Sequence, residues 1–152
     1  MNKKKRDIIK IFKKKKIVLG TWSHIIDTKA IEAIADTPID FFILDLEHGP
    51  HSYNDVINLI TAIENMNKFA FVRIPYNNSS DILRSLDSGA HGLFIPHVSS
   101  LEKAEMAIQN TLYGNNINSR GVSTLSKSSL YDFDRQISYL SSENKYSRLC
   151  VR

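Results

Sequence analysis

The sequence of 152 residues predicts an α/β fold built on a parallel β-sheet. Three apolar segments, 41–46, 69–75 and 92–98, have the length and composition of strands buried on both faces. One stretch with apolar residues at helical spacing lies between each consecutive pair. Because strands that alternate with single helices are joined by right-handed crossovers, these repeated βα units predict a parallel sheet with helices packed on it.

The amino-terminal half adds another strand and two helices. A first strand is predicted over 17–22, and a short helix over 28–35 follows the candidate cap Asp27. A longer helix is predicted to begin behind Ser52, because Ser52 and Asp55 have the spacing of a capping box. Its predicted buried face carries Val56, Leu59, Ile60 and Ile63.

The pattern continues through two more helices. One helix is predicted over 81–88, with Gly89 as its carboxyl-terminal stop. Ser99 and Glu102 have capping-box spacing and predict a helix through Leu112. The predicted buried side chains of that last helix are Leu101, Ala104 and Ile108.

After these units the regular pattern fades. Residues 114–129 are rich in Asn, Ser and Gly and predict a long loop. A helix over 132–140 and the start of a fifth strand over 148–152 are predicted beyond it. Four or five βα units fit either an open doubly wound sheet or part of an eight-fold barrel. Gly20 stands alone and no glycine-rich phosphate-binding loop follows the first strand, so the nucleotide-binding version is not supported.

Charge divides the chain into a basic tail, residues 1–16, and a body, residues 17–152. The tail has nine basic side chains against one acid, a net charge of +8, so the total of +4 leaves −4 for the body. A lysine-rich tail can hold nucleic acid or anionic lipid, but a solvated helix end is the more common reading. No aromatic residues interleave with the lysines and no long apolar run follows, so neither a nucleic-acid partner nor a membrane partner is predicted. With one cysteine, the sequence favours a reducing, cytoplasmic location.

Polar side chains gather where the predicted strands end. Asp45, Glu47 and His48 follow the second strand, Arg73 ends the third, and Trp22 ends the first. The carboxyl ends of parallel strands meet at one edge of a sheet, where α/β proteins build active sites. Taken singly, each residue also fits a structural role, and His97 after the fourth strand is assigned one. Their joint placement favours a site.

These residue types predict proton transfer and anion stabilisation. The imidazole of His48 is suited to act as a general base near neutral pH. Arg73 can hold a carboxylate or an oxygen that gains negative charge. Asp87, on the helix after the third strand, is predicted to orient that imidazole and stabilise its protonated form.

Six motifs in order make the sequence resemble the HpcH/HpaI aldolase family, which includes 4-hydroxy-2-oxoheptanedioate and 2-dehydro-3-deoxyglucarate aldolases. The resemblance covers about residues 17–125. The matching motifs are Leu19-Gly20-Thr21-Trp22, Asp45-Leu46-Glu47-His48-Gly49-Pro50, Val72-Arg73-Ile74-Pro75, Leu86-Asp87-Ser88-Gly89-Ala90, Phe94-Ile95-Pro96 and Arg120-Gly121-Val122.

The resemblance implies a (β/α)8 TIM barrel, of which only the first four to five βα units are present. It implies a homo-oligomeric, metal-dependent class II aldolase that cleaves 4-hydroxy-2-oxoacids to pyruvate, or a related 2-oxoacid, and an aldehyde. His48 matches the catalytic base and Asp87 the acid paired with it, whereas Arg73 matches the arginine on the enolate oxygen. Trp22 would line the substrate pocket, and Asp45 and Glu47 would lie near a Mg, Mn or Co ion, in its second shell.

The sequence also departs from the family pattern. The family's two acidic metal ligands follow its fifth and sixth strands, and the chain ends just short of the first. No direct metal ligand is therefore assigned, and a truncated aldolase is predicted. The alternatives are a non-catalytic half-barrel that binds or assembles, and an anion or nucleic-acid binder led by the basic tail.

Overall fold

The computed structural model describes residues 8–15, 17–114, 119–129, 131 and 149–151. Its strands form one sheet in the order β1-β2-β3-β4-β5, and every neighbouring pair is parallel. A doubly wound sheet would reverse its strand order, whereas this sequential order is that of a TIM-barrel wall. The strands are β1 Gly20–Ser23, β2 Phe41–Asp45, β3 Phe69–Arg73, β4 Gly92–Ile95 and β5 Leu149–Val151.

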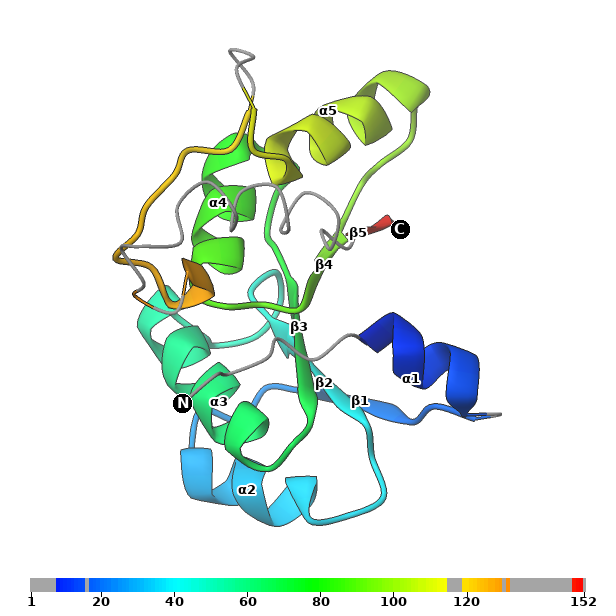
Figure 1. The fold of residues 1–152 in the computed structure, drawn as a ribbon, viewed down its shortest axis with the longest axis vertical. Helices are drawn as coiled ribbons and strands as arrows, with labels where there is room; N and C mark the ends of the chain where they lie inside the picture. The colour runs from blue at the N-terminus through cyan, green and yellow to red at the C-terminus, as the bar shows by residue number, and fades with distance from the viewer. Residues whose placement is uncertain (1–7, 16, 115–118, 130, 132–148, 152) are drawn as a thin grey trace.

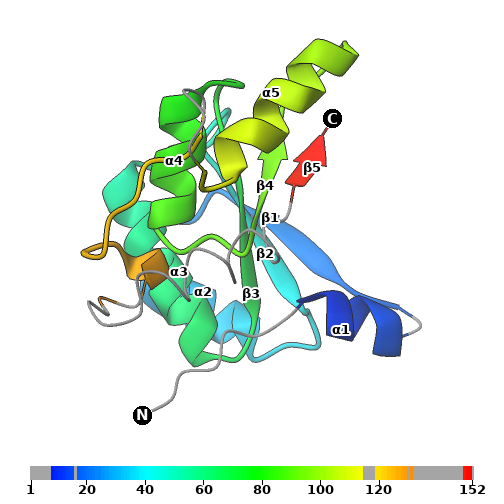
Figure 2. The same cartoon turned by 45° about the horizontal axis from the view of Figure 1, so that its top comes forward.

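The connecting helices cover one face of the sheet (Figure 1). Helices α2, α3 and α4 lie together on that face, and α1 lies on the opposite face, as Figure 2 also shows. The helices are α1 Ile8–Lys14, α2 Thr28–Ala35, α3 Tyr53–Asn65, α4 Ser79–Asp87 and α5 Leu101–Thr111, with a short 3₁₀ turn, η1, at Lys127–Ser129. The predicted βα alternation is thus confirmed.

Successive side chains of a strand point to opposite faces of the sheet, and each face has its own hydrophobic core. On the helix-covered face, Phe42, Leu44 and Val72 pack with α2, α3 and α4 in the main core. On the opposite face, Ile43 and Phe71 belong to a second, aromatic-rich cluster against which Ile11 of α1 packs. Both faces of β2 are buried, as the run of apolar residues predicted.

The helix ends predicted at Ser52 and Gly89 are confirmed, whereas the predicted starts of α4 and α5 are wrong. Ser52 and Asp55 form the predicted capping box of α3, and Gly89 has the positive φ of 96° that favours glycine after a helix. Helix α4 begins at Ser79, two residues earlier than predicted, behind the cap Asn78. The predicted Ser99 cap of α5 is incorrect, because the Ser100 side chain accepts the N–H of Lys103.

The predicted buried face of α5 is also wrong. Leu101 is 76% exposed and Ile108 is exposed as well, whereas the buried side chains are Ala107, Asn110 and Thr111. Helix α5 lies beside α4 and turns a face of small and polar residues inward. Apolar periodicity cannot find such a face, because it selects the largest apolar side chains.

Other predictions concern the ends of the chain. Helix α1 falls within the predicted basic tail, 1–16, of which residues 1–7 and 16 lie outside the described residues. The helix predicted over 132–140 also lies outside them, whereas β5 supplies the predicted fifth strand beside β4. Across the described ranges, no helix is both long and apolar enough to cross a membrane.

Candidate functional site

Asp45 lies at the carboxyl end of β2, directly opposite Arg73 of β3 in the strand register. Its side chain is 0% exposed. Two-residue alternation places Asp45 on the same face as Ile43, and Arg73 on the same face as Phe71. The sheet therefore brings both side chains together at the end of the aromatic-rich face, away from α2, α3 and α4.

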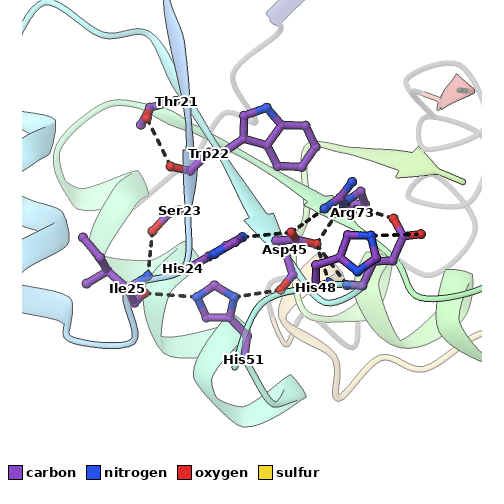
Figure 3. A network of polar contacts seen from close by, with 10 residues as sticks. Thr21, Trp22, Ser23, His24, Ile25, Asp45, His48, His51 and Arg73 are labelled. Atoms are coloured by element: carbon purple, nitrogen blue, oxygen red, sulfur yellow. Dashed lines mark hydrogen bonds and ion pairs between the residues drawn. The ribbon is translucent and has the colours of Figure 1, made fainter.

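Both carboxylate oxygens of Asp45 accept several hydrogen bonds (Figure 3). Oδ1 accepts from the N–H groups of Glu47 (3.0 Å) and His48 (3.2 Å) and from Arg73 Nε (2.9 Å). Oδ2 accepts from Arg73 Nη2 and lies 3.0 Å from His24 Nε2. Burial alone would raise the pKa of Asp45, but the hydrogen bonds from Arg73, the His48 N–H and His24 outweigh it and hold the pKa well below its usual range.

Arg73 is held on several sides and is only 13% exposed. Its Nε also lies 3.2 Å from Glu47 Oε2, and its guanidinium carbon lies 4.5 Å from the centre of the Trp22 ring. The hydrogen bonds to Asp45 and the attraction of both acids outweigh burial and raise the pKa of Arg73. Within the described part of the chain, Nη1 makes no hydrogen bond, so its two donors remain for a ligand.

Two imidazoles approach the other oxygen of Glu47. His48 Nε2 lies 3.7 Å from Glu47 Oε1, and His97 Nε2 lies 3.4 Å from it. The His48 side chain is 67% exposed, so a bound molecule can reach its ring. His97 follows β4 with a φ of 58°, a left-handed conformation uncommon for residues other than glycine and enriched at functional sites.

A buried histidine braces the loop that follows β2. His51 Nδ1 lies 3.0 Å from the carbonyl oxygen of Asp45, and Nε2 lies 3.1 Å from that of Ile25. Figure 3 shows His51 between these two backbone segments. A Cβ atom added to Gly49 would lie 2.3 Å from the Asp45 carbonyl oxygen, so this close turn requires glycine.

Among the described residues, Asp87 forms an ion pair with Arg120. Its carboxylate accepts a hydrogen bond from Arg120 Nη2, which also donates to Ser128 Oγ at 3.2 Å. The acid next to the His48 imidazole is Glu47. The structure therefore brings Trp22, Asp45, Glu47, His48 and Arg73 together as predicted, and these five residues form the Asp45 cluster. The pairing of Asp87 with His48 stays a prediction.

Comparison with known proteins agrees with the motifs at this sheet edge. The family profile described as HpcH/HpaI aldolase/citrate lyase matches residues 19–143. The chain belongs to this family. The matched range contains every predicted site residue, from Trp22 to Asp87.

Individual members of the HpcH/HpaI family are similar over most of the chain. The 5-keto-4-deoxy-D-glucarate aldolase of Escherichia coli (strain ATCC 8739) is 30% identical over 138 residues, which are 91% of this chain and 53% of the relative. A family protein of known structure from Burkholderia cenocepacia J2315 has a TM-score of 0.80 at 26% identity, covering 88% of this chain and 53% of that one. The HpcH/HpaI aldolase of Desulfitobacterium hafniense DCB-2 shares the fold, with a TM-score of 0.84 at 23% identity over 95% of this chain and 56% of that one. The chain spans about half the length of the curated relatives that it matches.

The described residues do not provide the metal site that the HpcH/HpaI resemblance implies. Among them, no group of three or more His, Cys, Asp or Glu side chains could hold a metal ion. Arg73 binds both carboxylate oxygens of Asp45. Glu47 is the only carboxylate of the Asp45 cluster with an oxygen, Oε1, that Arg73 does not bind. A single carboxylate beside two histidines does not form the oxygen-rich site that Mg²⁺ requires.

Sequence reasoning missed three participants. His24 follows β1 and reaches Asp45, and the strand-end argument applied to Trp22 would also have found it. His97 was assigned a structural role, but the structure places it against Glu47. His51 carried no usable signal, because its role depends on how the loop after β2 closes on Ile25.

Proposed function

We propose that this chain forms the 2-oxoacid-binding part of an aldolase active site, which cleaves 4-hydroxy-2-oxoacids to pyruvate, or a related 2-oxoacid, and an aldehyde. The observation that carries the proposal is the fixed guanidinium of Arg73, held by Asp45 and Glu47 and stacked by Trp22, with Nη1 unused among the described residues. Family membership supports the reaction class.

In the proposed reaction, a base removes the proton of the C4 hydroxyl group and the C3–C4 bond breaks. The aldehyde leaves, and the electron pair of the broken bond forms an enolate with negative charge on the C2 oxygen. The protonated base then returns its proton to C3, which gives pyruvate or the related 2-oxoacid. Arg73 Nη1 donates to that oxygen or to the neighbouring carboxylate. Because Asp45 fixes the guanidinium beforehand, little reorganisation is needed as the charge develops.

His48 is the proposed base. Its ring is exposed at the sheet edge and its backbone N–H is anchored on Asp45, so the residue is fixed while the imidazole stays accessible. Glu47 lies beside the ring and would stabilise the imidazolium that forms. Asp87 remains a second candidate for that role, on the strength of the family motif alone.

The resemblance also implies a divalent cation, Mg, Mn or Co, whose general role in such chemistry is to polarise the 2-oxoacid oxygens. Because the described residues offer no such site, the steps above are assigned to side chains alone. Asp45 and Glu47 keep their proposed place near the metal, with Asp45 acting through Arg73. A homo-oligomer is proposed as the assembled form.

The test measures pyruvate release from 4-hydroxy-2-oxoacids by the purified chain, with Mg²⁺, Mn²⁺ or Co²⁺ added in turn. Arg73→Lys should lower kcat/KM at least about a hundredfold, because a lysine cannot keep the two contacts to Asp45 and still present a donor. His48→Ala should lower kcat with little change in the binding of oxalate, an analogue of the pyruvate enolate. Arg84→Lys on α4 is the matched control, because Arg84 stacks on Tyr53 outside this cluster.

A second candidate, a non-catalytic half-barrel that binds a 2-oxoacid, makes a different prediction. It expects oxalate or pyruvate to bind in an Arg73-dependent manner without turnover under any metal. If neither ligand binds and no pyruvate is released, both proposals are wrong. The preorganised Arg73 favours a bound oxyanion in either case.

A further inference from the structure

A cavity of about 600 Å³ lies between the amino-terminal end of α4, helix α5 and residues 119–121. Figure 1 shows α4 and α5 next to each other, with the segment after α5 running back along α4. The volume falls within the range of small-molecule sites, about 300–1,000 Å³. Trp22, Asp45, His48 and Arg73 are absent from its wall.

Hydrogen-bond donors without partners line this cavity. The Arg120 side chain is 2% exposed. Its Nε is buried and has no hydrogen-bond partner among the described residues, although Nη2 binds Asp87 and Ser128. Ser79 and Ser80 begin α4, and none of the hydrogen bonds found in the described regions uses their N–H groups. Free N–H groups at a helix start, together with an arginine donor, favour an anion.

The side-chain amides of two asparagines belong to the wall of the same cavity. Asn77 Nδ2 donates to the carbonyl of Lys103 at 3.0 Å, but Asn77 Oδ1 is buried and no group in the described part of the chain pairs with it. Asn110, on α5, is 6% exposed, and its side-chain amide takes part in no hydrogen bond across the described ranges. Buried amide oxygens normally find a donor. A ligand that pairs with Asn77 Oδ1 must therefore carry a hydroxyl or N–H group.

The nearby acids do not oppose an anion strongly, because they are already paired. Asp81, in the first turn of α4, accepts hydrogen bonds from Tyr53 Oη (2.8 Å) and Asn78 Nδ2 (2.8 Å). Asp87 is held by Arg120. The remaining lining includes the apolar side chains of Leu83 and Met106, which suit a short carbon chain.

We propose that this cavity is a binding site for a small hydroxylated carboxylate. The carboxylate would accept from the first N–H groups of α4, a hydroxyl group would pair with the Asn110 amide, and the carbon chain would lie on Leu83 and Met106. Arg120 Nε and Asn77 Oδ1 are buried in the wall, so each would pair with the ligand after a small side-chain shift on binding. The proposal does not depend on the proposed aldolase reaction, because the groups that bind the ligand lie outside the Asp45 cluster.

The test titrates the full chain with D-glycerate, followed by isothermal calorimetry and by NMR of the Asn side-chain amides. Propionate lacks the hydroxyl groups, glycerol lacks the charge, and inorganic phosphate lacks the carbon chain. D-glycerate should bind at least about tenfold more tightly than each of the three, because each leaves a buried polar or apolar group of the cavity without its partner. Asn110→Leu should remove the amide and narrow the cavity, and so weaken D-glycerate binding about tenfold or more, whereas Asn54→Ala, at an exposed asparagine of α3, should leave binding unchanged.

Circular dichroism establishes that each variant is folded, and Asn77→Ala replaces Asn110→Leu if the latter does not fold. Arg73→Lys separates the two regions of the protein: binding at the cavity should persist in that variant. No measurable binding of D-glycerate, binding that Arg73→Lys removes, or binding that both cavity variants retain would overturn the proposal. Equal binding of D-glycerate and phosphate would do so as well, because it would mean that any oxyanion suffices.

Discussion

Replacing Asp45 by asparagine tests whether this carboxylate holds the sheet edge together. The carboxylate accepts two hydrogen bonds from Arg73, two from the backbone N–H groups of Glu47 and His48, and one from His24. An asparagine has the same size, but its NH₂ group turns one acceptor into a donor. Whichever way the amide turns, its NH₂ group faces one of the N–H donors that bind Asp45. Water cannot relieve this clash, because the Asp45 side chain is 0% exposed.

The expected loss of stability follows from the Arg73 pair. Removing one partner of a buried ion pair costs about 3–5 kcal/mol, and the surviving amide oxygen keeps part of the hydrogen bonding, so we expect about 3 kcal/mol for Asp45→Asn. In a chain of this size that loss lowers Tm by roughly 6–12 °C. Thermal and urea unfolding followed by circular dichroism at pH 7 measure it. Asp36→Asn, at the exposed end of α2, is the matched control with an expected change below about 0.5 kcal/mol.

The same pair predicts a pH dependence with a definite sign. Hydrogen bonds hold the pKa of Asp45 below its usual range, so ionisation of Asp45 stabilises the folded protein above the unfolded-state pKa of about 3.9. The stability difference between wild type and Asp45→Asn should stay constant from about pH 7 to pH 5 and narrow as the pH falls further, toward the folded-state pKa. A difference below about 1 kcal/mol at pH 7, or one that widens in acid, would refute the reasoning.

Three further substitutions test separate parts of the site. Trp22→Ala should raise KM for the 2-oxoacid about fivefold by removing the ring on Arg73, with kcat little changed in steady-state assays. Gly49→Ala should cost about 1–3 kcal/mol in urea unfolding, because the new Cβ would lie 2.3 Å from the Asp45 carbonyl oxygen. Ser52→Ala should cost about 1 kcal/mol by removing the cap of α3, and an unchanged Tm would contradict that assignment.

Local signals explain why most of the fold could be predicted. Strands β2, β3 and β4 are short apolar runs, and Ser52 with Asp55 or Gly89 marks a helix end through its own side chain or backbone conformation. Strand β1, predicted over 17–22, lies at Gly20–Ser23 instead. The buried face and the capping residue of helix α5 could not be predicted from such local signals. Its buried face carries Ala107 and Asn110, and which serine caps it depends on geometry that spacing alone does not distinguish.

Some contacts of the candidate site could likewise be predicted from the sequence, and others could not. Asp45 and Arg73 could be predicted to converge, because the parallel register alone places them side by side. The contacts of Asp87 could not be predicted, because they depend on the path of the segment that carries Arg120, a stretch without regular secondary structure. His97 could not be assigned either, because its left-handed backbone conformation, which accompanies its approach to Glu47, leaves no mark in the sequence.

Asp45 is buried and fully hydrogen-bonded, whereas the groups proposed to react remain available to a ligand. This contrast fits a preorganised site. Every oxygen of the buried Asp45 carboxylate is occupied by a group that it positions, so it has no lone pair left to offer a substrate or a metal ion. Arg73 Nη1 and the exposed His48 ring, which Asp45 fixes through other atoms, are the groups left available. In the proposed site Asp45 touches no substrate, yet changing it would remove the geometry of the groups that do. Activity should therefore fall in Asp45→Asn even at temperatures where the protein is fully folded.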